Sequence, residues 1–373
     1  MLRRLPWLLF AAAVSAACAA SLLSIWAEDA WLADLAVNFR LQYLAIALLA
    51  VPVLLWRRSL PLAAATLATI VLNAAPVYAY FQAAGGSADD AATRSASASA
   101  SASASTSTSV PASVSAPAPV PLAATLGPAG RVHPATIEAA APSSAGRVPL
   151  RIASANVLFL NSDYAAVTAW ARRTRPDVLL FLEATAAWRS GLAPLEAEYP
   201  YVQYVTDRSH HGLLLLSHWP LTDVVTRPAT ARQMRPVVFS TLTKDGARLR
   251  LAAMHATWPM HPSIARQRQR DLDALAAEAS RRGPLPFVGV GDFNISPFSP
   301  HYQATLRAGG LRNAAAGHGW QPTWPAMFLP LGIQIDHALV SPEVEVQAFH
   351  RGSPNGSDHM PIIVDVLIPR ITG

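Results

Sequence analysis

Polar residues recur in the second half of this 373-residue chain at points where an apolar run ends or is about to begin. If the apolar runs are β-strands, their ends form a rigid rim that can hold several side chains over one cleft. The positions are Asn156, Glu183, His255, Asp292, Asn294, Asp336 and the triplet Ser357-Asp358-His359. Together they predict one shared polar site.

Carboxylate and amide oxygens are preferred ligands of hard divalent cations, and a nearby histidine can transfer a proton or stabilise developing charge. Taken singly, such an Asn or Asp more often caps a turn, and a lone His is more often structural. The sequence contains no HExxH, GxxxxGK[ST] or GxSxG motif, and its one cysteine, Cys18, cannot supply a cysteine zinc site or an internal disulfide. The pattern favours cation-assisted chemistry over peptidase zinc, P-loop or serine chemistry.

The elements that must position these residues are short apolar runs, most of which read as buried strands. Two helices are also expected, one over Ala165–Arg173 and one over Ser263–Ser280 with Ser263 as its N-cap. Lys244-Asp245-Gly246 predicts a hairpin turn. The expected strands are Leu150–Leu158, Val178–Leu182, Leu213–Leu216, Val237–Leu242, Leu249–Met254, Phe287–Val290, Ile335–Val340, Val344–Phe349 and Ile362–Leu367. Hairpins among so many strands indicate a mixed, layered α/β domain and not a simple parallel sheet.

In this order, the polar positions resemble the endonuclease/exonuclease/phosphatase superfamily. The most specific parts are Gly291-Asp292-Phe293-Asn294 and the later Ser357-Asp358-His359-Met360-Pro361-Ile362, and the resemblance runs from about Arg151 to Val366. It implies an α/β fold, a four-layer α/β sandwich of two mixed β-sheets flanked by helices. It also implies metal-assisted attack of water on a phosphoester, with Mg²⁺ or Mn²⁺ as cofactor.

The resemblance also implies a role for each position. Glu183, with Asn156 beside it and Asp358 as a further carboxylate, would bind the metal. Asp292 would orient or deprotonate the attacking water, and Asn294 would hold the water or a phosphate oxygen. The remaining catalytic residues would be His359 on the scissile phosphate, Asp336 orienting that imidazole, and His255 near the leaving oxygen.

Two positions depart from the family pattern. Leu158 stands two places after Asn156, where some DNA-repair members carry an acidic residue, which weakens an assignment to abasic-site repair. His218 replaces the Arg of the family's Ser-Arg-x-Pro segment.

Three apolar runs open the chain: Leu5–Ile25, Phe39–Trp56 and Leu60–Phe81. Each approaches the roughly 20 residues that a helix needs to cross a bilayer, so three transmembrane spans are expected, the rival being a cleaved signal peptide before a helical hairpin. Arg3-Arg4 and Arg57-Arg58 mark cytoplasmic ends, whereas the first loop carries Glu28, Asp29 and Asp34. This predicts a multi-pass protein of the bacterial inner membrane whose C-terminal domain lies outside the cytoplasm.

The expected domains are a three-helix anchor over 1–84, a linker over 85–146 and a catalytic domain over 147–373. The linker is rich in Ala, Ser and Pro and lacks large apolar residues, which predicts disorder. From Arg147 onward, 22 Lys and Arg residues stand against 17 Asp and Glu, a net of +5. A basic domain suits an anionic substrate, although genome composition explains the charge equally well.

A subgroup resemblance narrows the expectation. The three runs, the linker, Ser296-Pro297-Phe298-Ser299-Pro300 and Gln321-Pro322-Thr323-Trp324-Pro325 resemble membrane-bound bacterial members that include the VanJ-type glycopeptide-resistance proteins. This implies a lipid-linked pyrophosphate, such as a polyprenyl carrier, as one candidate substrate. The candidate substrate-binding residues are Arg268, His211 and Trp324, whose alternative roles are a solvated helix face, a loop and core packing.

The leading hypothesis is a membrane-anchored, metal-dependent phosphoric ester hydrolase in contact with the bilayer and a phosphate-containing substrate. The second is an extracytoplasmic nonspecific nuclease, for which no alternating basic and aromatic groove is readable. The third is a binding module without catalysis. No protein partner is predicted.

Overall fold

The computed structural model describes residues 5–82, 146–206, 210–227 and 235–370. The predicted linker, except for Gly146, lies outside the described residues. The helices before this gap and the strands after it belong to one compact unit.

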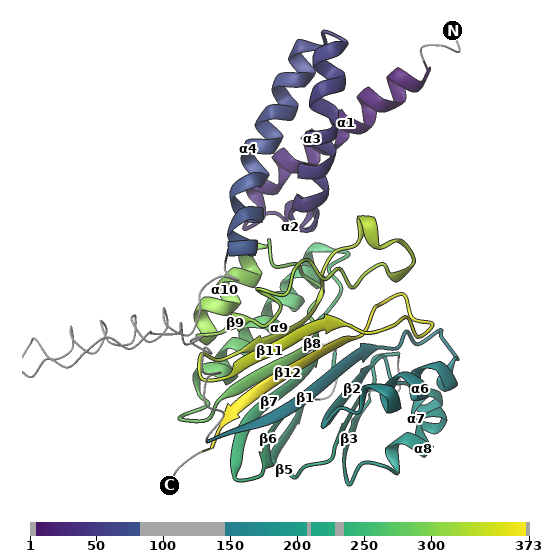
Figure 1. The fold of residues 1–373 in the computed structure, drawn as a ribbon, viewed down its shortest axis with the longest axis vertical. Coiled ribbons are helices and arrows are strands. Elements are labelled where there is room, and N and C mark those ends of the chain that lie inside the picture. Colours follow the sequence, from purple (N-terminus) through teal and green to yellow (C-terminus); the bar gives the residue numbers. More distant parts are fainter. Residues whose placement is uncertain (1–4, 83–145, 207–209, 228–234, 371–373) are drawn as a thin grey trace, which may run out of the picture. The chain divides into compact units, whose positions relative to one another are not determined.

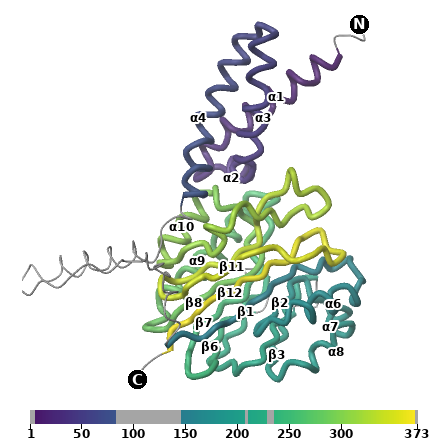
Figure 2. Tube along the Cα trace, viewed as in Figure 1, coloured from purple at the N-terminus to yellow at the C-terminus, as the bar shows by residue number. Residues whose placement is uncertain are grey.

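The first of two six-stranded sheets has the order β11-β12-β1-β2-β4-β3. Strands β1 and β2 are parallel, and the other neighbours are antiparallel. Figure 2 shows β1 in teal and β12 in yellow side by side along the sheet. The bounds are β1 (Arg147–Asn156), β2 (Val178–Leu182), β3 (Tyr201–Val205), β4 (Leu213–Ser217), β11 (Glu345–Arg351) and β12 (Ile362–Pro369).

The second sheet has the order β5-β6-β7-β8-β10-β9, with β7 and β8 as its parallel pair. Strands β6 and β7 form the predicted hairpin, in which Asp245 and Gly246 take φ of 48° and 79° between the paired Lys244 and Ala247. The bounds are β5 (Leu221–Arg227), β6 (Val237–Lys244), β7 (Ala247–His255), β8 (Phe287–Asp292), β9 (Arg312–Asn313) and β10 (Asp336–Val340).

The two sheets pack face to face, and helices cover their outer faces (Figure 1). Leu180 of β2 faces the other sheet, whereas Leu179 and Phe181 pack under the helices, so β2 is apolar on both faces and reads as a continuous run. The covering helices are α6 (Tyr164–Thr174), α7 (Ala186–Gly191) and α8 (Ala193–Glu196) on the first sheet and α9 (Pro262–Ser280) and α10 (Pro300–Gly309) on the second. The predicted four-layer sandwich is confirmed.

The three N-terminal apolar runs are helical. Two helices are long and apolar enough to cross a membrane, and a bent pair of helices, with 62° between its members, makes a third span if it is counted as one. Short helices lie in the turn after the first span. The bounds are α1 (Leu5–Leu23), the 3-10 helix η2 (Ser24–Trp26), α2 (Trp31–Val37), α3 (Arg40–Trp56) and α4 (Leu60–Gln82).

Helix α2 is joined to the sandwich by buried polar contacts. The Asp34 carboxylate pairs with the Arg268 guanidinium of α9 and accepts a hydrogen bond from Ser299 Oγ at 2.6 Å. Asn38 Oδ1 accepts a bond from the Ser296 backbone N–H at 2.8 Å. The contacts with Ser299 and Ser296 reach the segment that follows β8, and the contact with Arg268 reaches α9.

The N-cap expected at Ser263 is wrong. His261 is the N-cap of α9, and its side chain accepts from the Ser263 backbone N–H. Pro262 explains the shift, because proline fits the first helical position, and the cap then falls on the residue before it, two residues before Ser263. The strands β3, β5 and β9 and the helices α7, α8 and α10 were not expected, since their residues alternate too little or are too few.

Candidate active site

The predicted polar residues meet at one end of the sandwich because the parallel pairs of both sheets finish there. Asn156 ends β1, His255 ends β7 and Asp292 ends β8. Asp292 is paired in register with His255 on one side and with Asp336, the first residue of β10, on the other. Strand pairing alone therefore places three of the predicted side chains next to one another.

The backbone at this end adopts conformations that most residues avoid. Gly291, just before Asp292, has a φ of +144°, and a Cβ there would stand 1.9 Å from the Met254 carbonyl oxygen of β7. Glu183 and Asn294 have φ of 59° and 51°. Left-handed conformations of non-glycine residues cost free energy and often occur at functional sites. Here they turn the chain sharply at the ends of β2 and β8.

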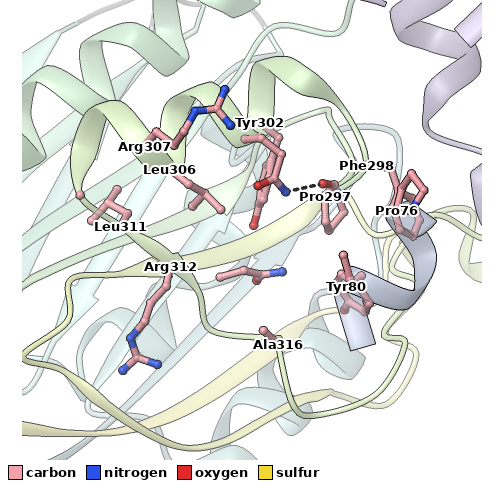
Figure 3. A pocket seen from close by; sticks show the side chains of 14 residues that line it. Pro76, Tyr80, Pro297, Phe298, Tyr302, Leu306, Arg307, Leu311, Arg312 and Ala316 are labelled. Atoms are coloured by element: carbon pink, nitrogen blue, oxygen red, sulfur yellow. Dashed lines mark hydrogen bonds between the residues drawn. The ribbon is translucent and has the colours of Figure 1, made fainter. Parts of the chain in front are cut away.

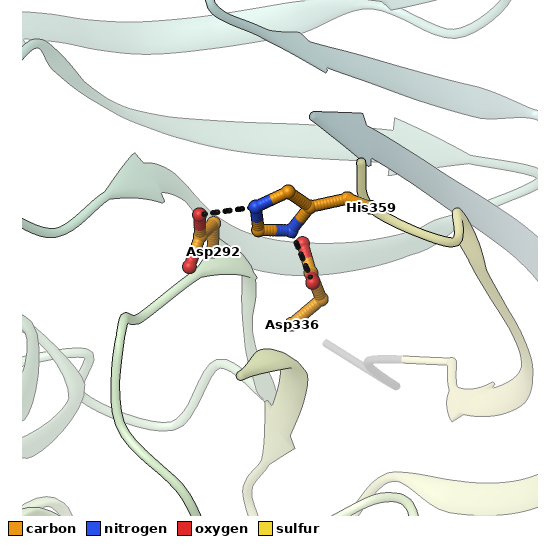
Figure 4. Close-up of side chains that lie close together, drawn as sticks. All are labelled: Asp292, Asp336 and His359. Atoms are coloured by element: carbon orange, nitrogen blue, oxygen red, sulfur yellow. Dashed lines mark hydrogen bonds and ion pairs between the residues drawn. The ribbon is translucent and has the colours of Figure 1, made fainter. Parts of the chain in front are cut away.

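Asp292, Asp336 and His359 form a buried cluster (Figure 4). His359 Nδ1 lies 2.8 Å from Asp336 Oδ2, and His359 Nε2 lies 3.7 Å from Asp292 Oδ2. The backbone N–H of Asp336 donates to Thr323 Oγ1 at 3.2 Å, which fixes the start of β10. The imidazole is held between two carboxylates.

This arrangement raises the pKa values of both Asp292 and His359. Burial raises the pKa of Asp292, the nearby Asp336 carboxylate raises it further, and the result is about 7. Burial alone would lower the pKa of His359, but the Asp336 and Asp292 carboxylates outweigh it and raise the pKa to about 10. The cluster thus combines a carboxyl that can accept a proton near neutral pH with a cationic imidazole.

Asn156 connects the cluster to Glu183. Its Nδ2 donates to Glu183 Oε1 and to Asp292 Oδ2, each at 3.2 Å. Asn156 Nδ2 therefore lies between one carboxylate oxygen of Glu183 and one of Asp292. The negative charge of these two carboxylates also favours a cation nearby. Oxygen donors of this kind fit a hard divalent cation such as Mg²⁺ or Mn²⁺.

Asp292, Asp336 and His359 also offer three ligand atoms within 4.8 Å of one another. His359 is the weakest of them as a ligand, because a protonated imidazole has no free lone pair. The side of the cluster toward Glu183 is the better cation site.

His255 lies on the far side of Asp292, with its Nε2 3.4 Å from Asp292 Oδ2. Burial and the positive charge of Arg235 lower the pKa of His255 well below its ordinary value, so this imidazole is neutral. Arg235 Nη1 lies 3.1 Å from His255 Nδ1 and 4.0 Å from Glu183 Oε1. Sequence reasoning missed Arg235, because a single Arg before a strand carries no distinguishing pattern.

The loop before β12 is built onto the same end. Ser357 Oγ donates to the Asn156 carbonyl oxygen at 2.7 Å, and the His359 backbone N–H donates to Ser357 Oγ at 3.1 Å. Asp358 Oδ2 accepts from Trp324 Nε1 at 3.1 Å. Trp324 therefore holds a predicted metal ligand in place.

Two predicted residues, Arg268 and Asn294, use side-chain donors on protein groups, and a third, His211, lies near His255. Arg268 is buried, pairs with Asp34 and donates from Nη1 to the Asn294 carbonyl oxygen at 2.9 Å. The Asn294 side chain donates to the Ala256 carbonyl oxygen at 2.9 Å. His211 lies close enough for its charge to lower the pKa of His255.

A cavity of about 640 Å³ lies away from the cluster. It opens between the end of α4 and the region of α10 and β9, and Tyr80, Phe298, Tyr302 and Arg312 point into it (Figure 3). None of the described cluster residues lines it.

The comparisons with known proteins agree with this geometry. The model of the Endonuclease/Exonuclease/phosphatase family matches residues 153–359. No curated protein matches the chain. A solved endonuclease/exonuclease/phosphatase from Beutenbergia cavernae DSM 12333 shares 18% identity over 59% of this chain and 72% of its own length, with a TM-score of 0.50.

Two further solved structures are similar. D. rerio TDP2 complexed with a single-strand DNA product shares 18% identity over 58% of this chain and 98% of its own, with a TM-score of 0.49. A family protein from Bacteroides thetaiotaomicron shares 17% identity over 60% and 98%, with a TM-score of 0.48. The family model spans more than half of the chain and includes every residue of the cluster, so the chain belongs to the endonuclease/exonuclease/phosphatase family.

Proposed function

We propose that the protein is a membrane-anchored, divalent-metal-dependent phosphoester hydrolase. The observation that carries the proposal is the buried trio in which His359 lies between Asp336 and Asp292, with Asn156 linking Asp292 to Glu183. A structural role alone does not require three buried titratable side chains and two left-handed residues at one end of the sandwich.

The reaction needs a base, a positively charged group beside the phosphate and an oriented water. Asp292, whose pKa is about 7, accepts the proton of the water as its oxygen attacks phosphorus. His359 stays protonated and stabilises the negative charge that develops on the phosphoryl oxygens. Asp336 holds the imidazole in place. The bond from phosphorus to the leaving oxygen breaks and its electron pair stays on that oxygen, to which the neutral His255 imidazole, 3.4 Å from Asp292, would donate a hydrogen bond.

The metal would be held by Glu183, Asn156 and Asp358, with Mg²⁺ or Mn²⁺ as the ion. When bound, such an ion polarises the phosphoryl oxygens and lowers the cost of their charge. Arg235, whose Nη1 lies 4.0 Å from Glu183 Oε1, partly compensates the negative charge of that carboxylate.

The N-terminal helices extend the proposal to location. Arg57 and Arg58 lie in the short turn between α3 and α4, and positive charge in a short loop supports a cytoplasmic turn with the sandwich outside, at the bacterial inner membrane. A phosphate ester or pyrophosphate presented at the bilayer, including a lipid-linked one as in VanJ-type proteins, is the substrate we favour. A nonspecific nuclease of the same fold is the alternative, favoured only by the net charge of +5.

The test uses the full-length chain in detergent micelles with Mg²⁺, with Mn²⁺ or with a chelator. Three substrates are offered: a chromogenic phosphodiester, plasmid DNA and a prenyl pyrophosphate. We expect metal-dependent turnover of the prenyl pyrophosphate, lost in Asp292→Asn. Loss of plasmid without turnover of the lipid favours the nuclease, and no turnover with no calorimetric metal binding leaves a binding module.

A further inference from the structure

The loop from Trp320 to Ile335 contains no charged residue. It includes the 3-10 helix η3 (Ala326–Leu331), in which Met327, Phe328 and Leu331 are 89%, 52% and 50% exposed. A charge-free loop that exposes several large apolar side chains is unusual on a soluble surface and indicates an apolar partner.

One end of this loop is fixed to helix α3. Gln42 lies in the first turn of α3, and its Nε2 donates to the carbonyl oxygens of Leu331 at 3.3 Å and Gly332 at 2.7 Å. The other attachment is to the last turn of α4, where Tyr80 Oη donates to Gln334 Oε1 at 2.9 Å and the Tyr80 ring packs edge-on against Trp320. The loop is therefore tied to the same end of two apolar helices.

The only charged residue of α3 is its first residue, Arg40. Arg40 Nη1, at the start of α3, donates to the Leu72 carbonyl oxygen at 3.2 Å and to Asn73 Oδ1 at 3.4 Å. Charged side chains are costly in hydrocarbon, so they are rare within membrane-spanning stretches and pair with polar groups where they occur. Gln42 lies two residues after Arg40, so the loop is attached to α3 at the end where the apolar run of this helix begins.

The same loop touches the candidate active site. The Ala326 backbone N–H donates to the Asp358 carbonyl oxygen at 2.8 Å, and Trp324 Nε1 donates to Asp358 Oδ2 at 3.1 Å. Asp358 directly precedes His359, so the segment that carries the exposed apolar side chains is hydrogen-bonded to the residue next to the catalytic cluster.

We infer that Met327, Phe328 and Leu331 insert into the outer surface of the lipid bilayer and hold the catalytic cluster at headgroup level. This inference rests on the membrane anchoring in the proposed function and adds a second, monotopic contact to it. Apolar side chains on a polar-backbone loop enter the interface and not the hydrocarbon centre. A catalytic cluster held at this level would act on phosphoesters whose carrier stays in the membrane.

The direct test places a fluorophore on the loop in the full-length protein. Cys18, the sole cysteine, is replaced by Ala, and Phe328→Cys is labelled with the environment-sensitive dye NBD. Val225→Cys, on edge strand β5 and 47% exposed, is the matched apolar control. Both variants are reconstituted in phosphatidylethanolamine–phosphatidylglycerol vesicles containing a lipid with a doxyl quencher near the headgroup.

We expect strong quenching at position 328 and little at 225. Equal, weak quenching at both positions overturns the inference. A blue shift at 328 that persists without quenching and grows with protein-to-lipid ratio indicates contact with a second copy of the chain, which also overturns it. The anchoring itself is checked separately, since an anchored chain stays with the vesicles after alkaline carbonate extraction whether or not the loop inserts.

The consequence for substrate choice is tested with Met327→Asp/Phe328→Asp. Its KM for a vesicle-borne phosphoester should rise about tenfold, while hydrolysis of the soluble chromogenic phosphodiester stays at the wild-type rate. Phe328→Leu, which keeps an apolar side chain, should behave like the wild type. An unchanged KM on vesicles refutes the docking role, whereas an inactive wild-type protein refutes the proposed function and leaves the quenching result intact.

Discussion

At the scale of single residues, the properties of the site come from charges that are removed from water. His359 keeps a proton because Asp336 and Asp292 lie beside it, and Asp292 has a pKa near neutrality because it is buried next to another carboxylate. The protonation state of each group depends on its neighbours. Substitutions that keep the side-chain shape and remove the charge are therefore the most informative.

Replacing Asp336 by Asn should lower kcat by about 100-fold or more, because the imidazole loses the charge that holds it in its protonated form. The side-chain shape is nearly unchanged, so the unfolding temperature should move little. The measurement is kcat on the chromogenic phosphodiester beside a thermal melt. Asp365→Asn, which removes a surface carboxylate paired with Arg151, is the control and should keep full activity. A wild-type kcat in Asp336→Asn contradicts the role assigned to this pair.

At the scale of elements, the site depends on how strands β7, β8 and β10 end. Register places His255, Asp292 and Asp336 in one row, and Gly291 permits the close approach of β8 to β7. The geometry is therefore set by backbone pairing before any side chain acts.

Gly291→Ala should destabilise the fold by about 3 kcal/mol or more, since an added Cβ meets the Met254 carbonyl oxygen in addition to the backbone strain. Gly283→Ala is the matched control: its φ is +64°, but no atom lies within 4 Å of the added Cβ. It should cost about 1 kcal/mol, the strain alone. Chemical denaturation measures both, and equal losses contradict the importance of the close approach.

The contact between α2 and α9 makes a second element-scale prediction. Asp34 and Arg268 side chains are 2% and 1% exposed, so removing one partner leaves a buried charge unpaired. Asp34→Ala should cost about 3 kcal/mol. Adding Arg268→Met should recover part of that loss, because the orphaned cation disappears. A double-mutant cycle in detergent decides it, and strictly additive losses speak against a coupled pair.

The sequence predicted most strands and the polar site because both depend on local pattern. The residue types at the strand ends predicted five members of the polar site, and their side chains lie together at one end of the sandwich: Asn156, Glu183, His255, Asp292 and His359. Arg268 shows the limit. On the sequence it is one of three alternating arginines of a helix, and its partner Asp34 lies 234 positions away in another segment. No periodicity encodes such a contact.

Arg235 was missed for a related reason. It belongs to no predicted strand or motif, and its position beside His255 follows from how β6 pairs with β7. The N-cap of α9 shows the same limit on a smaller scale, because Ser263 is a better cap by composition than His261.

At the scale of the whole molecule, the two sheets are fastened together at the end opposite the site. Asp177 Oδ1 accepts from Lys244 Nζ at 2.7 Å and from Trp219 Nε1 at 2.8 Å, and Asp177 Oδ2 accepts from the Arg151 backbone N–H at 2.8 Å. Lys244 belongs to the second sheet and Arg151 to the first. The Asp177 carboxylate therefore links the two sheets.

The stability that the Asp177 carboxylate contributes should depend on pH in a predictable way. Burial raises the pKa of Asp177, but the Arg151, Lys244 and Trp219 hydrogen bonds lower it by more, so the folded pKa lies below the ordinary value. The stabilisation is therefore present above about pH 4 and is lost as the pH falls through the folded pKa. Asp177→Asn should cost about 2 kcal/mol at pH 7 and progressively less in acid.

Denaturant titrations of wild type and Asp177→Asn from pH 7 down to pH 3 measure this difference. A gap between the two proteins that is constant across the range shows that the carboxylate charge contributes nothing. Asp223→Asn, a largely exposed carboxylate near Arg248, should show no gap at any pH.

The ion pair of Asp34 with Arg268 has a consequence for a shortened chain that begins at the sandwich. Without α2, the Arg268 guanidinium loses its carboxylate partner and is open to water, and the same guanidinium donates to the Asn294 carbonyl oxygen, two residues beyond Asp292. The segment after β8 would therefore lose part of its support in such a fragment, and the full-length chain is the fair standard for measuring turnover.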